Sequence, residues 1–199
     1  GTALNTANNN TLIGYEAGKG VVAANMNTVV GDNAFAGTNT DSNSASNTVL
    51  GAFAMNVSSG AKENTAIGRD AGREVTSGDN NIFLGYNAGA NDSTSGITTG
   101  SGNVIIGTVD PDSRTGDRQL KITGNDGSTA TTWISGDNNG IVTFADDLII
   151  KDSGTIGSAS DTDLLTLGSA ILTVAGEVSM TTLDIGGTNV TSTAAELNI

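Results

Sequence analysis

The chain has 199 residues, a net charge of −13 with only eight Lys and Arg residues, and neither cysteine nor histidine. Nucleic-acid phosphates and anionic membrane surfaces attract proteins through a positive field, so neither is an expected partner of so acidic a chain. The missing cysteine excludes disulfides and thiolate metal sites, and no apolar stretch approaches the roughly 18 residues of a membrane span, so membrane insertion is not expected.

The composition favours many short strands joined by tight turns. There are 28 glycines, a single proline and abundant Asn, Asp, Ser and Thr, whereas aromatic residues make up only 4% of the chain. Compact single domains of this length normally use more aromatic side chains to fill a core. We therefore expect an all-β protein without long helices.

A short motif repeats along the first half of the chain. NTLIG at residues 10–14 returns as NTVVG, NTVLG, NTAIG, NIFLG and NVIIG, at intervals of 17 to 22 residues. The copies begin at Asn10, Asn27, Asn47, Asn64, Asn81 and Asn103. A nearly fixed period of this size indicates stacked coils, so residues 1–109 are predicted to form six NTxxG-type coils of a parallel β-solenoid or β-roll.

Each copy carries two adjacent apolar side chains, which point to opposite faces of a strand. The third residue after the asparagine is always Ile, Val or Leu, and we expect this row to form the inner core of the repeat: Ile13, Val30, Leu50, Ile67, Leu84 and Ile106. The preceding row would then face outwards: Leu12, Val29, Val49, Ala66, Phe83 and Ile105. Because soluble monomers rarely expose such a stripe, this second row is expected to be a subunit interface, most simply of a homotrimer around a common axis, although an unrelated partner would also cover it.

Other columns of the repeat have structural interpretations. The asparagines are expected to cap turns and to stack as a hydrogen-bonded ladder. The glycine after each strand is expected to supply a special backbone angle or a close approach, and an alanine three residues later, at positions 17, 34, 54, 71 and 88, a tight corner. A threonine column at positions 11, 28, 48 and 65 raises ice binding as an alternative, but it breaks at Ile82 and Val104.

The rule of the sequence changes after the repeats. Residues 110–118 contain Pro111 and a turn-forming run, and are predicted to be a linker. Residues 119–193 contain short runs such as QLKITG, TTWISG and GIVTF, which predict a strand-rich region. Trp133 is expected to anchor packing between strands, with a sugar-stacking platform as the alternative. Thr193 and Glu196 form a capping-box pattern, which predicts that a helix begins at 194–199.

Residue types offer little for catalysis. Without histidine, triads with an imidazole base and His-ligated metals are excluded, which leaves paired carboxylates as the remaining acid and base of a glycosidase. Those carboxylates are Asp110, Asp112, Asp117, Asp146 and Asp147, and each lies in or beside an apparent turn. The runs DPDSRTG and GNDGS partly match calcium-binding loops but depart from the ligand spacing. We therefore assign no catalytic residue, cofactor or metal.

Several phrases resemble those of a known class of fibrous proteins. NTLIGYEAG, NTAIGRDAG and NIFLGYNAG resemble the NTAIGYNAG-type repeats of bacteriophage tail fibres, which often precede a self-cleaving trimeric chaperone domain. DDLIIKDSGTIGSASDTDLLTL and GTNVTSTAAELNI are similar to segments that recur in tail-fibre and other structural proteins of marine phages. The repeat also resembles the heads of trimeric autotransporter adhesins, which are trimeric parallel β-rolls. The copies at Asn47 and Asn103 depart from the pattern because they lack the AG that usually follows the strand.

The resemblance implies an elongated homotrimer on an extracellular virion: a structural tail-fibre segment, not an enzyme, with a β-solenoid or β-roll followed by a fibre shaft. Its expected partners are further copies of itself, other tail proteins and a host cell-surface receptor such as a polysaccharide. A bacterial surface adhesin of the autotransporter type and a polysaccharide-degrading tail spike are the alternatives.

Overall fold

The computed structural model describes residues 7–37, 44–90, 94–145, 184–185 and 188–189. Contacts divide the chain into two units, residues 1–148 and 149–199. Every regular element among the described residues is a strand, which confirms the predicted all-β class for that part of the chain. The helix expected at 194–199, and the strands expected at residues 146–183, lie outside the described residues.

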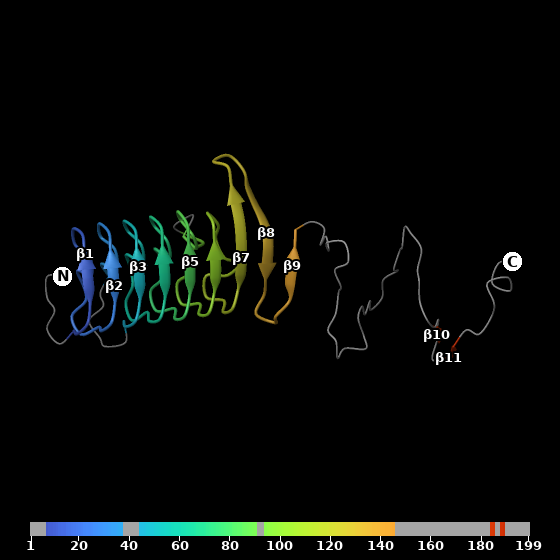
Figure 1. The fold of residues 1–199 in the computed structure, drawn as a ribbon, viewed down its shortest axis with the longest axis horizontal. Helices are drawn as coiled ribbons and strands as arrows, with labels where there is room; N and C mark the ends of the chain where they lie inside the picture. Colours follow the sequence, from blue (N-terminus) through green and yellow to red (C-terminus); the bar gives the residue numbers. More distant parts are fainter. Residues whose placement is uncertain (1–6, 38–43, 91–93, 146–183, 186–187, 190–199) are drawn as a thin grey trace, which may run out of the picture. The chain divides into compact units, whose positions relative to one another are not determined.

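Each copy of the repeat forms one short strand of the first unit. The strands are β1 (Thr11–Ile13), β2 (Thr28–Val30), β3 (Thr48–Leu50), β4 (Thr65–Ile67), β5 (Ile82–Leu84) and β6 (Val104–Ile106). Neighbouring strands pair in parallel with equivalent residues opposite each other, so the coils stack in strict register (Figure 1). The predicted β-solenoid is therefore present.

The sheet does not end with the repeats. β7 (Leu120–Asn125) pairs in parallel with β6, and β8 (Ala130–Gly136) and β9 (Val142–Phe144) continue the same sheet as antiparallel strands. Residues 110–118, expected to be a linker, return the chain from β6 to β7 against the preceding coil: Thr98 N donates to Arg114 O and Arg118 N donates to Ser101 O. The boundary expected at residue 109 thus does not interrupt the sheet. In the second unit, β10 (Asp184–Ile185) and β11 (Thr188–Asn189) form an antiparallel pair.

A ladder of buried asparagines runs through the stacked coils, as expected. Asn64 is representative: its backbone N–H and its Nδ2 both donate to Oδ1 of Asn47, at 3.0 and 3.1 Å, and its own Oδ1 accepts the same two bonds from Asn81. Its Nδ2 also donates to Gly78 O at 2.9 Å. The same arrangement links Asn10, Asn27, Asn47, Asn64, Asn81 and Asn103. Buried amides of this kind are stable only when paired, so the ladder fixes the register between coils.

Gln119 is a seventh member of the ladder that the sequence analysis missed. Its backbone N–H and Nε2 donate to Oδ1 of Asn103, at 2.8 and 3.1 Å. The longer side chain also reaches the turn before it, where Nε2 donates to Ser113 O and Gly116 O and Oε1 accepts from Ser113 N. Two features of the sequence could have identified it: Gln119 follows Asn103 by 16 residues, close to the repeat period, and a strand begins directly after it. Gln119 therefore ends the ladder and ties residues 113–116 to the last coil.

The inner core is the row that the sequence analysis placed outside, so that assignment was inverted. Val29, Val49, Ala66, Phe83 and Ile105 are fully buried, and Leu12 packs partly buried against them. The predicted core row, which consists of Ile13, Val30, Leu50, Ile67, Leu84 and Ile106, is exposed or only half-buried instead. Side chains alternate along a strand, so the buried ladder asparagine and the second residue after it share one face. The third residue must then point out of the coil.

The size of the core side chains is shared between two positions in each coil. One is the middle residue of the strand, and the other is a corner residue six positions later. Where the strand contributes Val29 or Val49, the corner contributes the fully buried Phe35 or Met55. Phe83 instead lies between two glycine corners, because a Cβ at Gly72 would lie 2.7 Å from its Cδ2 and a Cβ at Gly89 would lie 2.5 Å from its Cε1. Large residues at one position are thus matched by small residues at the other, as close packing requires.

This balance also explains the copy at Asn47, which lacks the expected AG. Met55 replaces the corner glycine but keeps a positive φ of 44°, against 57° at Gly72. Its N–H donates to Ala71 O at 3.0 Å, as the N–H of Gly72 donates to Ala88 O at 2.9 Å. The coil therefore keeps its geometry there at the cost of a strained backbone angle.

The glycine and alanine columns have the expected roles. Gly51 has a φ of +144°, and a Cβ there would collide with the backbone of Gly68 in the next coil. Equivalent contacts join Gly14 to Gly31, Gly31 to Gly51 and Gly68 to Gly85. The alanine column is fully buried or nearly so: Ala17, Ala34, Ala54, Ala71 and Ala88. Both columns let the coils approach closely at one corner.

Replacing Phe83 by alanine tests the corrected core. Removing a buried phenylalanine between two glycines leaves a cavity, so Phe83→Ala should lower the free energy of unfolding by about 3–5 kcal/mol. The exposed Tyr15→Ala change is the control and should cost under about 0.5 kcal/mol. Chemical unfolding followed by circular dichroism measures both, and equal effects would place Phe83 outside the core.

Replacing Asn64 tests the ladder. Asn64→Ala leaves buried partners in both neighbouring coils without hydrogen bonds and should destabilise the fold by about 1–3 kcal/mol. Asn64→Asp has nearly the same shape, but its second oxygen would face the carbonyls of Gly78 and Lys62 that now accept from Nδ2, so it should destabilise at least as much. The exposed Asn138→Ala is the control in the same unfolding measurement. A ladder that contributes little would leave Asn64→Asp as stable as the parent.

Candidate interaction surface

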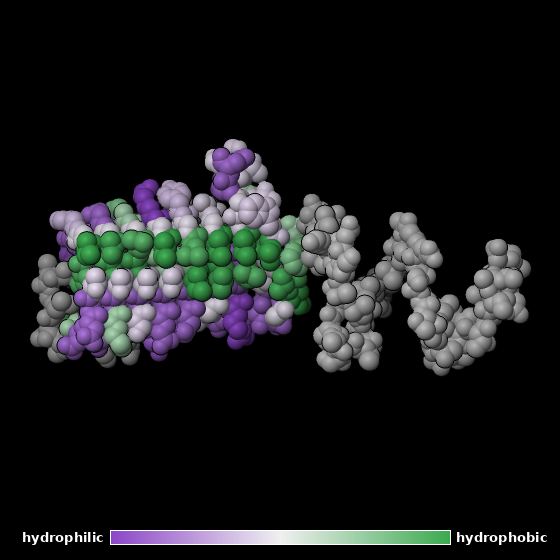
Figure 2. Space-filling view, viewed as in Figure 1, coloured by the Kyte–Doolittle hydropathy of each residue, from purple (hydrophilic) through white to green (hydrophobic). Residues whose placement is uncertain are grey.

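The outer face of the sheet carries an unbroken apolar row. In a three-residue strand only the middle side chain enters the coil, so the first and third point outwards. The strand register aligns the third positions of β1 to β7 with Ile134 of β8 and the third position of β9. We call them the outer apolar row: Ile13, Val30, Leu50, Ile67, Leu84, Ile106, Ile122, Ile134 and Phe144. Figure 2 shows this row as a green band that crosses the successive strands.

Much of this row is open to solvent in the isolated chain. The exposed fraction is 59% for Ile13, 46% for Leu50, 38% for Ile67 and 43% for Phe144. With about 4.8 Å between strands, the row is roughly 38 Å long. Soluble monomers rarely present a continuous apolar surface of this extent, and large exposed patches usually mark interaction sites.

The predicted subunit interface therefore needs a correction. Leu12, Val29, Val49, Ala66, Phe83 and Ile105 line the inside of the coil and cannot contact another chain while the coil is folded. One apolar row does face outwards, but it is the row of third residues after the asparagines and not the row of second residues. The surface that another molecule could cover is the outer apolar row.

The first strand positions form a second outward row beside it. Thr11, Thr28, Thr48 and Thr65 are aligned by the strand register, and Ile82, Val104 and Leu120 continue the row. In Figure 2 this appears as a pale band below the green one that turns green along the later strands. The outer face thus becomes more apolar from β1 towards β7.

The last strands of the sheet are apolar on their outer side only. At β7, β8 and β9 the positions that continue the inner row are Lys121, Ser135 and Thr143. Nζ of Lys121 lies 2.8 Å from Oδ1 of Asp112, which closes the end of the core with an ion pair. Ile134 and Phe144 meanwhile remain on the outer face. These strands have no apolar core of their own on the inner side.

The carboxylates considered for catalysis are held in turns. Asp112 pairs with Lys121, and Oδ1 of Asp117 accepts from Ser101 N at 2.8 Å. Both line one pocket of about 310 Å³, together with Asp137. Asp110 also has an interaction partner, and Asp146 and Asp147 lie outside the described residues. Among the residues that the structure describes, no three His, Cys, Asp or Glu side chains are grouped to hold a metal ion.

The two β-hairpin turns are closed by aspartates. Oδ1 of Asp126 accepts from the N–H groups of Thr129 and Ser128, at 2.8 and 2.9 Å, and from the Ser128 hydroxyl. These bonds lower the pKa of Asp126 below its ordinary value of 3.8, and the bond from the Thr129 N–H has the largest effect. Asp137 is equivalent in the next turn, where bonds from Ile141 N and the Asn139 side chain lower its pKa. The segment GNDGS, considered above as half a calcium site, is thus a turn in which the Asp126 carboxylate accepts hydrogen bonds from the N–H groups of the residues that follow it.

No family model matches the chain, and no match is found among the curated proteins or the solved structures. Within the described part of the chain there is no helix with the length and hydropathy needed to cross a membrane.

Acid titration tests the aspartate turns. A carboxyl group whose pKa is lowered on folding stabilises the turn above its unfolded pKa and stops doing so as the pH falls through its folded pKa. The chemical shifts of the Ser128 and Thr129 amides should therefore stay constant from neutral pH to below the ordinary pKa of 3.8 and then change as the carboxylate is protonated. NMR amide shifts recorded against pH measure this. Asp126→Asn should abolish the titration at these two amides but preserve it at Ile141, and a transition at or above pH 3.8 would contradict the turn geometry.

Proposed function

We propose that this chain is a segment of a homotrimeric virion fibre of a bacteriophage tail, and that it supports attachment to the host cell from an extracellular position. Its partners in this proposal are two further copies of itself, other tail proteins and a cell-surface receptor. The proposed class of protein rests on the resemblance of the repeat and shaft segments of the sequence to those of tail fibres. The association comes from the outer apolar row, now assigned to residues that point out of the coil.

The observation that carries the association is the end of the sheet. Strands β8 and β9 place Ile134, Val142 and Phe144 on the outer face, and 52% of Val142 is exposed. On the inner side these strands present Ser135 and Thr143. Antiparallel strands without an apolar face against a core are only marginally stable in water. A second chain that covers the outer face would give them the core that a single chain lacks.

The geometry of the row favours parallel copies around one axis. Successive rungs of one chain repeat at the strand spacing, so parallel copies would bring the same rungs together at the same height. Threonine rungs would then lie near threonine rungs at one end and isoleucine or leucine rungs near their equivalents at the other. The number three is taken from the resemblance to trimeric fibres and β-rolls.

A fibre of this kind acts by display, not by chemistry. Buried ladders and in-register coils make a stiff rod, and three identical chains present any binding surface three times. Linked copies of a weak site bind a multivalent cell surface far more tightly than one copy does. Reach, rigidity and multivalency are the properties that host attachment requires.

The oligomeric state tests this proposal. Sedimentation of the purified chain should give a homotrimer. Leu50→Asp places a carboxylate in the middle of the outer apolar row and should shift the chain towards monomer, because a charge that is buried without a partner is strongly unfavourable. Leu50→Thr introduces no charge, and threonine suits a strand because it is β-branched, so this change should weaken assembly less.

Ser59→Asp is the matched control, because it adds the same charge to an exposed turn of the same coil and should leave the trimer intact. Circular dichroism verifies that each variant keeps its strands. A monomeric parent chain, or a Leu50→Asp variant that stays trimeric, would contradict the proposal.

A further inference from the structure

Trp133 lies in an unusual position on the hairpin formed by β7 and β8. The pairing register shifts between Ile122, which faces Ile134, and Thr123, which faces Thr132, so Trp133 is the extra residue of a β-bulge. Bulges re-aim a side chain and are frequent beside binding sites. The hairpin also extends past the stacked coils, as Figure 1 shows, which places its tip clear of the solenoid.

The indole ring is held by packing and yet open to solvent. A Cβ at Gly124 would lie 2.5 Å from Cη2 of Trp133, so only glycine at that position leaves room for the ring. Contact with the neighbouring strand is what the sequence analysis expected of a packing residue. However, 56% of Trp133 remains exposed. The ring is therefore a fixed apolar platform with much of its surface available.

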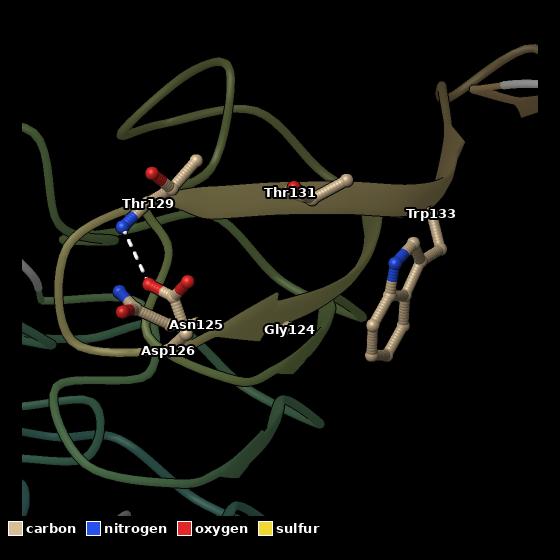
Figure 3. Close-up of a pocket in the computed structure, with 6 residues that line it drawn as sticks. All are labelled: Gly124, Asn125, Asp126, Thr129, Thr131 and Trp133. Carbon is tan, nitrogen blue, oxygen red and sulfur yellow. Dashed lines mark hydrogen bonds between the residues drawn. The ribbon is translucent and has the colours of Figure 1, made fainter.

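Polar groups lie along the hairpin to one side of this platform. Trp133 and Gly124 line a shallow, open pocket of about 430 Å³ together with Asn125, Asp126, Thr129 and Thr131. Figure 3 shows Thr131 on the same strand as the tryptophan, with Asn125, Asp126 and Thr129 at the turn end of the hairpin. Asn125 Oδ1 accepts from Gly127 N at 2.7 Å, which orients its amide. The volume lies within the range of about 300–1,000 Å³ typical of small-ligand sites.

From this arrangement we infer that the hairpin binds a neutral sugar ring of a glycan, stacked on Trp133 and hydrogen-bonded by Thr131 and Asn125. One face of a pyranose ring carries C–H groups that pack on an aromatic ring, while its hydroxyls both donate and accept hydrogen bonds. Threonine hydroxyls and an asparagine amide match those hydroxyls because they too both donate and accept.

The charge of the site selects against other ligands. Asp126 is charged at neutral pH, since its pKa lies below the ordinary value of 3.8, and its carboxylate repels phosphates and other anions. A cation would gain from a charged aspartate and an aromatic face, so choline is the competing ligand in the test below. A shallow, open pocket with hydroxyls also suits a sugar better than an aliphatic chain. The inference deepens the proposed host attachment by naming a ligand class for it.

Fluorescence of this single tryptophan tests the inference directly. The parent chain is titrated with cellotriose, maltotriose and chitotriose, and separately with choline chloride and inorganic phosphate. At least one trisaccharide should shift the emission saturably, and choline and phosphate should not. A response to choline without a sugar response, or no saturable response to any trisaccharide, overturns the inference.

Calorimetry with the trisaccharide that binds then measures how much individual residues contribute to the affinity. Trp133→Leu should weaken binding by about tenfold or more and Thr131→Val by about threefold, which corresponds to losing a stacking face and a hydrogen bond. Thr143→Val, on β9 and outside the pocket lining, should have no effect. Unchanged affinity in Trp133→Leu contradicts the site. Sedimentation of the same variant should show the parent's oligomeric state, and dissociation would make Trp133 an interface residue instead. Because assembly and sugar binding are measured separately, either proposal can fail alone.

Discussion

The buried asparagine ladder is the constraint on which the rest of the structure depends. Each amide oxygen accepts two hydrogen bonds from the next coil, as Oδ1 of Asn81 does from Asn103 at 2.9 Å for both bonds. A slip of one residue between coils would break all of these bonds and leave buried amides unpaired. The ladder therefore holds equivalent residues opposite each other, and every other column, inside or outside, is continuous because of it.

This fixed register also decides what faces solvent. The asparagine of each copy and the second residue after it share the inner face. The third residue after the asparagine must therefore point out of the coil. Inside, variation is tolerated because a corner compensates, as with Phe83 between Gly72 and Gly89 and with Val29 and the corner residue Phe35. Outside, the residue is always Ile, Val, Leu or Phe across nine strands. A uniform apolar surface beside a variable core is what the proposed packing of identical copies would require.

The repeat, its strands and the asparagine ladder could be predicted from the sequence because each depends on spacing alone. The two faces could not be told apart by uniformity: the constant third residue resembled a core, and the row that varies from Ala66 to Phe83 resembled a surface. What distinguishes the two faces is the burial of the ladder asparagines. Asn64 lies inside the coil, so Ala66, two residues later on the same side of the strand, lies inside as well. The continuation of the sheet past residue 109 was hidden because Gln119 replaces asparagine and Lys121 replaces an apolar residue. Exposure of Trp133 depends on a β-bulge and on Gly124 across the hairpin, which no local pattern reveals.

The central claim is that the outer apolar row is covered in the folded protein, and cysteine labelling tests it most directly because the chain has no cysteine of its own. Ile67→Cys places one thiol in the row, and Ser59→Cys places one on an exposed turn. The account predicts that, without denaturant, a maleimide reacts readily with the thiol at position 59 and slowly with that at position 67. Equal reactivity of the two thiols in the folded protein would contradict it.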